Sequence, residues 1–478
     1  MKKLSILLLL LTGVVFAQKQ QFGEAFEFDD KGEINPQFVL ADNYNYYLMT
    51  ASDEYKTSFE RCITMRKFDQ ANKMVDAYKY KLPKLDQNAL YDYMGYSEIG
   101  GKLTVFTQSY WGKGKKNALY KHEFDKATNT FNSTEIFANA IESNNKSGNA
   151  YLQKSDNGRF VAVGYIYDRP KQQPEKVMIM MLDAVTNNVV WQKEFSFADE
   201  NYTKEFAVTN SGKVVFHRFV KGWKKQNFLV LASADTQEEK QFGTEVFVHD
   251  IKAISINSQD YIVAFNYPVK TVRGGGDFSN LMLYDLQAGR IINNVDINEF
   301  RPVKDLRDVQ ITNTSVQGNE IHVFAEGRTE TITKTGTSPS GMTGFPEQLI
   351  KHGPASMIVL NADGSLKTVK KLNFDENAKA PFYHSFGLTN VKGSYWVNGV
   401  MYQGFYPLAN GSFDRDANNN VRFIDFEPLR YSYNHRAPEH VNYVTPLMHY
   451  FPDTNKIIFA RVVNDPSQPT MNIVSVQL

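Results

Sequence analysis

The sequence predicts an all-β protein built from repeated four-stranded antiparallel units. Two turn-and-strand patterns recur in alternation along the chain, and no convincing amphipathic helix of ten residues follows the N-terminal segment. The composition agrees, because 42% hydrophobic and 13% aromatic residues are ample for a packed core and argue against disorder.

The N-terminus reads MKKLSILLLLLTGVVFAQ, with two lysines before a short apolar run. Val15-Phe16-Ala17 fits the small-x-small cleavage rule loosely, so we expect residues 1–17 to be a secretory signal peptide cut before Gln18. No cysteine follows the apolar run, and no later stretch approaches the length of a membrane span. We therefore expect a soluble exported protein, periplasmic or extracellular, that is not a lipoprotein and has no transmembrane segment in its mature chain.

The first pattern is a turn followed by a β-rich run, as in DNGRFVAVG at 156–164. Eight copies occur, and the distance from one copy to the next runs from 47 to 74 residues. They read YNYYLMT at 44–50, GGKLTVFT at 100–107, NGRFVAVG at 157–164, SGKVVFHR at 211–218, SQDYIVAF at 258–265, GNEIHVFA at 318–325, KGSYWVNG at 392–399 and TNKIIFAR at 454–461. Each copy predicts the hairpin between the first two strands, a and b, of a unit.

The second pattern lies between these copies, where an apolar strand ends at Asp or Asn, turns, and another strand begins. The residues at this place are Asp69, Asp125, Asp183, Asp285 and Asn361. An Asp side chain can accept a hydrogen bond from the backbone two residues on, so we interpret these residues as turn-formers and not as an acid cluster. They predict the hairpin between the third and fourth strands, c and d.

Four-stranded units at this spacing are typical of a β-propeller, and the pattern resembles the WD-repeat, TolB-like and YVTN-type propellers over nearly the whole mature chain. We predict a single propeller domain over 18–478 with eight blades, or seven if the irregular seventh unit and the eighth are one blade. The last copy lacks a fourth strand. QFGEAFEFD at 21–29 would supply it and close the ring.

In such a ring the a–b and c–d turns share one face, and the b–c loops lie on the other. The first four b–c loops carry eleven basic and three acidic residues, in a chain whose net charge is only +1. We predict a binding surface there for an acidic protein or a glycan, with a merely solvated loop face as the alternative. Its candidate residues are Trp111, Lys113, Lys115, Lys116, Arg169, Lys171, Lys221, Trp223, Lys224, Lys225, Lys270 and Arg273. The Gly-, Ser- and Thr-rich sixth loop, 327–356, is either a lid or partner-gripping segment or a disordered insertion.

One stretch, FDRDANNNVRFID at 413–425, resembles the twelve-residue calcium loops of EF-hand and dockerin proteins. That resemblance implies oxygen ligands from Asp414, Asp416, Asn418, Asn420 and Asp425. The stretch departs from the loop at Asn419, where the family has glycine, and an ordinary Asx-rich turn is the alternative. We expect no other cofactor.

The sequence contains no G-x-S-x-G elbow, P-loop, zinc-type histidine spacing or dinucleotide-binding fingerprint. It therefore favours a non-catalytic binding or scaffold component of a Gram-negative cell envelope, whose partner is a protein or glycan and not nucleic acid. The alternative is a carbohydrate-active enzyme, a lyase or glycosidase, with its site at the central channel. Perturbed carboxylates converging at the channel mouth would favour the enzyme.

Overall fold

The computed structural model describes residues 20–27, 33–42, 44–52, 62–83, 85–86, 89–169, 173–198, 201–220, 227–242, 246–268, 280–300, 308–337, 343–372, 379–380, 386–391, 394–399, 404–409, 412–413, 424–425, 441–463 and 470–478. Its helices in this part are single turns such as η1 (Asn144–Lys146) and η3 (Asn298–Phe300). None of them has the length or apolar character needed to cross a bilayer. The remaining elements are strands, in eight sheets that we call blades 1 to 8.

Blades 1 to 4 are four-stranded antiparallel meanders. Blade 1 holds β3 (Glu33–Ala41), β4 (Asn45–Ser52), β5 (Cys62–Asp69) and β6 (Met74–Lys81). Blade 2 holds β7 (Leu90–Ile99), β8 (Lys102–Trp111), β9 (Lys116–Asp125) and β10 (Thr130–Ala140). Blade 3 holds β11 (Asn149–Lys154), β12 (Phe160–Ile166), β13 (Glu175–Asp183) and β14 (Asn188–Phe197). Blade 4 holds β15 (Asn201–Val208), β16 (Val214–Val220), β17 (Asn227–Ala232) and β18 (Gln237–Gln241).

Blades 5 to 8 follow the same order, with short additions. Blade 5 holds β19 (Val246–Ile256), β20 (Gln259–Pro268), β21 (Asn280–Asp285) and β22 (Arg290–Asp296). Blade 6 holds β23 (Asp308–Gln317), β24 (Glu320–Thr337), β25 (Thr343–Asn361), β26 (Leu366–Leu372) and the short β27 (Lys379–Ala380). Blade 7 holds β28 (Phe386–Val391), β29 (Ser394–Gly399), β30 (Gly404–Ala409), β31 (Ser412–Phe413) and β32 (Ile424–Asp425). Blade 8 holds β33 (Val441–Phe451), β34 (Lys456–Val463) and β35 (Thr470–Gln477), joined by β1 (Gln20–Phe22) and β2 (Phe26–Glu27).

The eight predicted a–b turns each begin the second strand of a separate sheet, so the prediction of eight units is confirmed. The seventh unit forms its own sheet, because β30 pairs with β29 on one side and with β31 and β32 on the other. It is therefore not an insertion into blade 8.

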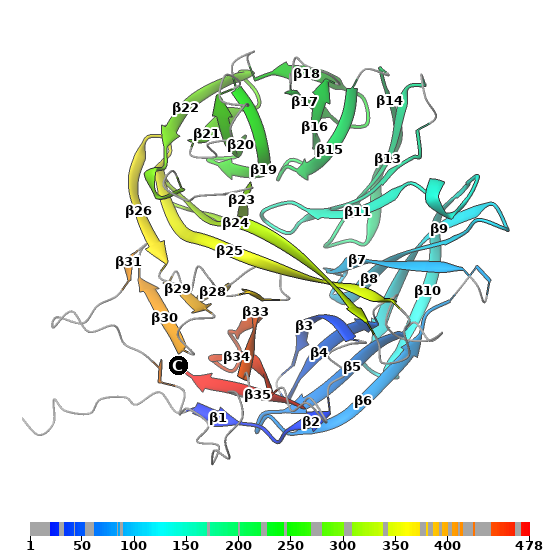
Figure 1. Cartoon of the computed structure of the whole chain (residues 1–478), viewed down its shortest axis with the longest axis vertical. Helices are drawn as coiled ribbons and strands as arrows, with labels where there is room; N and C mark the ends of the chain where they lie inside the picture. The colour runs from blue at the N-terminus through cyan, green and yellow to red at the C-terminus, as the bar shows by residue number, and fades with distance from the viewer. Residues whose placement is uncertain are drawn as a thin grey trace, which may run out of the picture.

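The N-terminal strand completes blade 8, as predicted. β1 pairs antiparallel with β35 in the register Gln20↔Val476, and β2 pairs with the same strand farther along. Apolar clusters join neighbouring blades, and between blades 6 and 7 the Phe324 and Tyr395 rings are in contact. Blade 8 packs against blade 1 through a cluster that includes Phe38, Tyr46 and Phe451. Figure 1 shows the resulting ring, with the first strands of the blades toward its middle.

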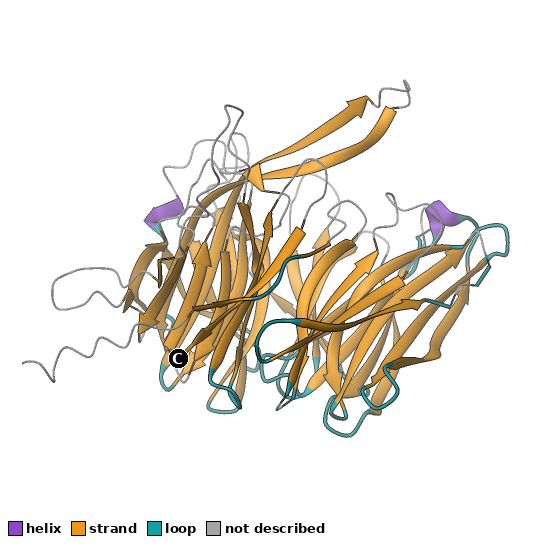
Figure 2. Ribbon diagram, turned by 90° about the horizontal axis from the view of Figure 1, so that it is seen from below, coloured by secondary structure: helices purple, strands orange, loops and turns teal. Residues whose placement is uncertain are grey.

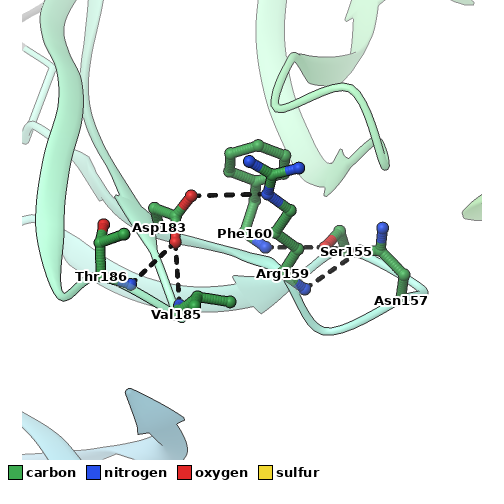
Figure 3. A network of polar contacts seen from close by, with 7 residues as sticks. All are labelled: Ser155, Asn157, Arg159, Phe160, Asp183, Val185 and Thr186. Atoms are coloured by element: carbon green, nitrogen blue, oxygen red, sulfur yellow. Dashed lines mark hydrogen bonds and ion pairs between the residues drawn. The ribbon is translucent and has the colours of Figure 1, made fainter. Parts of the chain in front are cut away.

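The c–d turns close as their sequence predicts. Asp69, Asp125, Asp183 and Asp285 each accept a hydrogen bond from the backbone N–H two residues on, at 2.8–2.9 Å. The fifth turn differs from the prediction: Asp363, and not Asn361, accepts the Ser365 N–H at 2.9 Å, while the Asn361 side chain donates to the Ser365 hydroxyl at 2.8 Å. Figure 3 shows the Asp183 turn beside the a–b turn of blade 3, where the Asn157 side chain accepts from the Arg159 N–H. These carboxylates are occupied by turn formation.

Candidate functional site

The two faces of the ring differ. We call the face that carries the a–b and c–d turns the turn face and the opposite face the arm face. The turn face consists of short, hydrogen-bonded loops such as Asp69–Lys73 and Ser155–Phe160. From the arm face a long hairpin projects beyond the body of the ring (Figure 2). Figure 1 shows it passing across the middle of the ring.

This hairpin is the sixth b–c loop, 327–356, which the sequence left open between a gripping segment and a disordered insertion. It forms regular structure: β24 and β25 continue outward from blade 6 and pair antiparallel up to Thr337↔Thr343. We call residues 329–351 the arm. Gly327 and Gly353 lie side by side at its base, where a Cβ on Gly353 would be 3.0 Å from the Gly327 carbonyl oxygen. Of the two alternatives, the disordered insertion does not describe the strand-paired residues of this segment.

The first b–c loop is shorter than the sequence suggested. Ser109–Trp111 belong to β8 and Lys116–Asn117 to β9, so only Gly112–Lys115 form the turn. Lys115 adopts a left-handed φ of 51°, and a Cβ on Gly114 would lie 1.9 Å from a Trp111 ring atom. The turn therefore packs directly on one face of the indole. Trp111 supports this turn and does not stand out as an exposed aromatic platform.

Two of the basic side chains are paired with acids from neighbouring strands. Lys116 Nζ lies 3.2 Å from Glu135 Oε2, and Lys176 Nζ lies 2.8 Å from Glu194 Oε1. Both acids belong to fourth strands, which a count over the loops alone leaves out. Arg169 donates from Nε to the Gln173 carbonyl oxygen at 2.8 Å. Lys113 and Lys115 are exposed at the tip of the turn. Because Lys116 and Lys176 are paired with acids, the net positive charge of this part of the arm face is smaller than the loop count indicates.

The other candidate binding residues lie outside the described part of the chain: Lys171, Lys221, Trp223, Lys224, Lys225, Lys270 and Arg273. The same holds for Asp414, Asp416, Asn418 and Asn420 of the predicted calcium loop. Its last residue, Asp425, is in β32, where it pairs with Gly404. Within the described residues no three His, Cys, Asp or Glu side chains come together as a metal site. The binding surface and the calcium loop remain predictions.

The structure does show a set of buried polar contacts that the sequence analysis missed. At five junctions of the described chain, a side chain of one blade accepts a hydrogen bond from a backbone N–H in the first strand of the next blade. The pairs are Gln108 with Ala150, Glu175 with Thr203, Asn227 with Val248, Asp250 with Ile311, and Thr389 with Tyr450. We call these contacts junction clips. They satisfy backbone donors that blade packing would otherwise bury unpaired.

The clip between blades 3 and 4 is ionic. Glu175 accepts from the Thr203 N–H at 2.9 Å and from the Thr203 hydroxyl at 2.6 Å. Arg218 Nη1 donates to the same carboxylate at 2.6 Å, and its guanidinium carbon lies 3.7 Å from the centre of the Phe197 ring. Arg218 is fully buried. A charge this deep is tolerated because it has both an ion partner and an aromatic face.

The clip between blades 5 and 6 holds a carboxyl group, that of Asp250, whose pKa is raised. Asp250 Oδ2 accepts from the Ile311 N–H at 2.6 Å, and burial raises the pKa of Asp250 to about 6. Glu205 hydrogen-bonds Asp250, and burial raises the pKa of Glu205 as well. Glu205 also lies 3.0 Å from Nδ1 of the fully buried His217, and burial lowers the pKa of His217 to about 3.

Perturbed carboxyls were the observation expected to favour an enzyme, yet the position of this pair points to structure. Asp250 makes the same kind of contact as Gln108, Asn227 and Thr389, which are neutral and cannot act as general acids. Its acceptor oxygen is already committed to a backbone donor. A sequence signal for these buried groups existed in blade 4, where VVFHRFV places His217 and Arg218 inside an apolar strand.

No protein-family model matches this sequence, and no curated protein matches it significantly. Among solved structures, the chain is similar to the β-propeller domain of the trilobed protease from Pyrococcus furiosus, with 10% identity, a TM-score of 0.38, and coverage of 80% of this chain and 94% of that one. An apocarotenoid oxygenase from Synechocystis matches at 10% identity and a TM-score of 0.34, covering 74% and 95%. A puromycin-hydrolyzing peptidase from Mycobacterium tuberculosis matches at 10% identity and a TM-score of 0.35, covering 80% and 60%. The repeated four-stranded meanders, packed in a ring and joined through the N-terminal strand, make this chain a β-propeller.

Proposed function

We propose that this protein is a non-catalytic binding module, exported to a Gram-negative cell envelope, that holds a protein or glycan partner on its arm face. The observation that supports the proposal is the asymmetry between the faces. The turn face is made of short loops whose polar groups bond one another, whereas the arm face projects a paired hairpin away from the body. Extended elements on one side of a repeat protein commonly form its binding side.

The described polar clusters support binding in preference to catalysis. The carboxyl groups of Glu175 and Asp250 each accept a backbone N–H group at a blade junction, which is a structural role. The exposed lysines Lys113 and Lys115 stand on the arm face and supply charge for recognition of an acidic group. Export, the envelope location and the partner class come from the sequence and belong to the proposal.

The test compares envelope crosslinking of three forms of the tagged protein. In the first, Lys113→Glu with Lys115→Glu reverses charge on the arm face of blade 2. In the matched control, Lys102→Glu with Lys126→Glu reverses two exposed lysines on the turn face of the same blade. We expect a specific crosslinked partner with the wild type and the control, and weaker capture with the arm-face variant. Equal capture by both variants would move the site off this part of the arm face, and capture lost only in the turn-face control would overturn the proposal.

A further inference from the structure

Within the described part of the chain, one strand edge of the arm has no pairing strand. Inside blade 6, β24 is paired on both sides, with β23 up to Arg328 and with β25. Beyond Arg328, no strand in the described part of the chain pairs with its other edge. An edge of this kind presents a row of backbone N–H and C=O groups that can pair with another strand.

The opposite edge of the arm is better protected. β27 pairs with β25 at Ile350 and Lys351. Pro346, also in β25, has no backbone N–H to offer. On the β24 side, residues 329–337 contain no proline, and no strand in the described part of the chain pairs with their free edge. Its register with β25 is regular from Glu330 to Thr335 and is bracketed by irregularities at both ends. A regular stretch between bulges is the part of an edge best suited to strand pairing.

The sequence of that stretch is self-complementary. Residues 329–335 read TETITKT, which has Ile332 at its centre, Glu330 two places before it and Lys334 two places after it. If two copies pair antiparallel about Ile332, each Glu330 stands opposite a Lys334, and each Thr opposite a Thr. The paired contact is isologous, as a two-fold symmetric dimer requires.

We propose that the β24 edge of the arm binds a second copy of this chain by antiparallel strand pairing centred on Ile332. The occupant is a second copy because the charges match only in this symmetric register: opposite charges face each other at both ends of the paired segment, and like charges would face each other in no position. A seven-residue strand pair is small compared with a standard protein interface, so the association is weak and is seen at high protein concentration. This inference concerns self-association and stands apart from the envelope partner proposed above.

The arm offers a charge-swap test that keeps its own cross-strand pairs intact. Within the arm, the register places Glu330 opposite Lys351 and Lys334 opposite Glu347. The first variant carries Glu330→Lys with Lys351→Glu, and the second carries Lys334→Glu with Glu347→Lys. In each variant the pair inside the arm stays oppositely charged. Between two copies of the same variant, however, positions 330 and 334 now carry the same sign.

Sedimentation velocity of the mature chain over a range of concentrations is the measurement. We expect the wild type to dimerise, each variant alone to dimerise about tenfold more weakly, and an equimolar mixture of the two variants to recover wild-type association. Recovery follows because the mixed pair restores opposite charges at both ends. Thermal unfolding of each variant confirms that the ring remains folded. A wild type that stays monomeric at every concentration, or a mixture no stronger than its separate components, would overturn the proposal.

Discussion

The strand edges inside the ring and the strand edge of the arm differ in whether their backbone groups have hydrogen-bond partners. At the blade junctions, N–H groups of first strands such as those of Thr203 and Ile311 are capped by a side chain of the preceding blade. In the arm, β24 beyond Arg328 has no such cap within the described chain. Side chains cap the edges of the first strands at these junctions, and capped edges cannot pair with another chain. The β24 edge of the arm has no cap in the described chain, so it is the edge that can pair with another molecule.

The comparison predicts that stability resides in the junctions and interaction in the arm. The largest expected effect is at the ionic clip. Arg218→Met leaves Glu175 buried without its cation, and this should lower the free energy of unfolding by about 3–5 kcal/mol. Urea unfolding at pH 7 measures it. Lys176→Met, which breaks the exposed pair with Glu194, is the control and should change stability by less than about 1 kcal/mol. Similar losses in both variants would remove the distinction between junction and surface.

Acid should lower the stability of the ring through two buried histidines, His122 of blade 2 and His217 of blade 4. Burial lowers the pKa of His217 to about 3 and that of His122 to about 4, so both stay neutral in the fold while the unfolded chain takes up protons below about pH 6.5. Stability is therefore full above that pH and falls as the pH drops, by about 2 kcal/mol for each histidine at pH 5. Asp250, whose pKa is raised to about 6, acts in the opposite direction over the same range and offsets part of the loss.

Unfolding free energies measured at pH 7, 6 and 5 test whether stability falls as the pH drops. His122→Gln should flatten the decline, since glutamine stays neutral and can hydrogen-bond two of the partners of His122, Thr107 and Ser133. A protein that became more stable between pH 7 and 5 would contradict the assignment of these histidines as buried and neutral.

Two substitutions at Asp250 separate the contribution of its hydrogen bond to stability from the contribution of its charge. Asp250→Ala removes the acceptor of the Ile311 N–H, and we expect a loss of about 1–3 kcal/mol. Asp250→Asn keeps an acceptor oxygen and removes the buried charge, so at pH 7 it should retain near-wild-type stability. Thermal unfolding of the two variants side by side makes the comparison. An asparagine variant as unstable as the alanine variant would mean that the charge itself holds the junction.

The smallest effect is expected in the arm. Replacing residues 329–351 by a short Gly-Ser turn joins two strands that already lie side by side at Gly327 and Gly353. The ring should keep its thermal midpoint within about 2 °C, since surface changes away from the core usually alter stability by less than about 0.5 kcal/mol. Differential scanning fluorimetry checks this. A large drop would show that the arm is part of the folding unit and weaken its assignment as an interaction element.

The sequence predicted the ring because its signals are local. Each blade begins with a turn and a β-rich run, and an Asp such as Asp183 bonds a backbone group only two residues away. The junction clips could not be predicted in this way. Glu175 and Arg218 are 43 residues apart, and Asp250 and Ile311 are 61 apart, so no spacing rule brings them together.

The candidate binding surface was predicted only in outline. Counting charge over the loops gave a strongly basic face, but Glu135 and Glu194 reach Lys116 and Lys176 from the fourth strands and reduce it. The first loop is shorter than predicted because the tight turn depends on a left-handed φ at Lys115 and on the close approach of Gly114 to the Trp111 ring. For the sixth loop the sequence left a lid or gripping segment and a disordered insertion as alternatives, because the Gly, Ser and Thr content hides the register that pairs Glu330 with Lys351.

Amide hydrogen exchange tests the contrast between covered and uncovered edges most directly. The protein would be labelled when dilute and again when concentrated, and the amides of Thr203, Ile311 and residues 329–335 compared. The account predicts that Thr203 and Ile311 are protected at both concentrations, and that alternate amides of 329–335 gain protection only in the concentrated sample. Full protection of 329–335 in the dilute protein, or rapid exchange at Ile311, would contradict it.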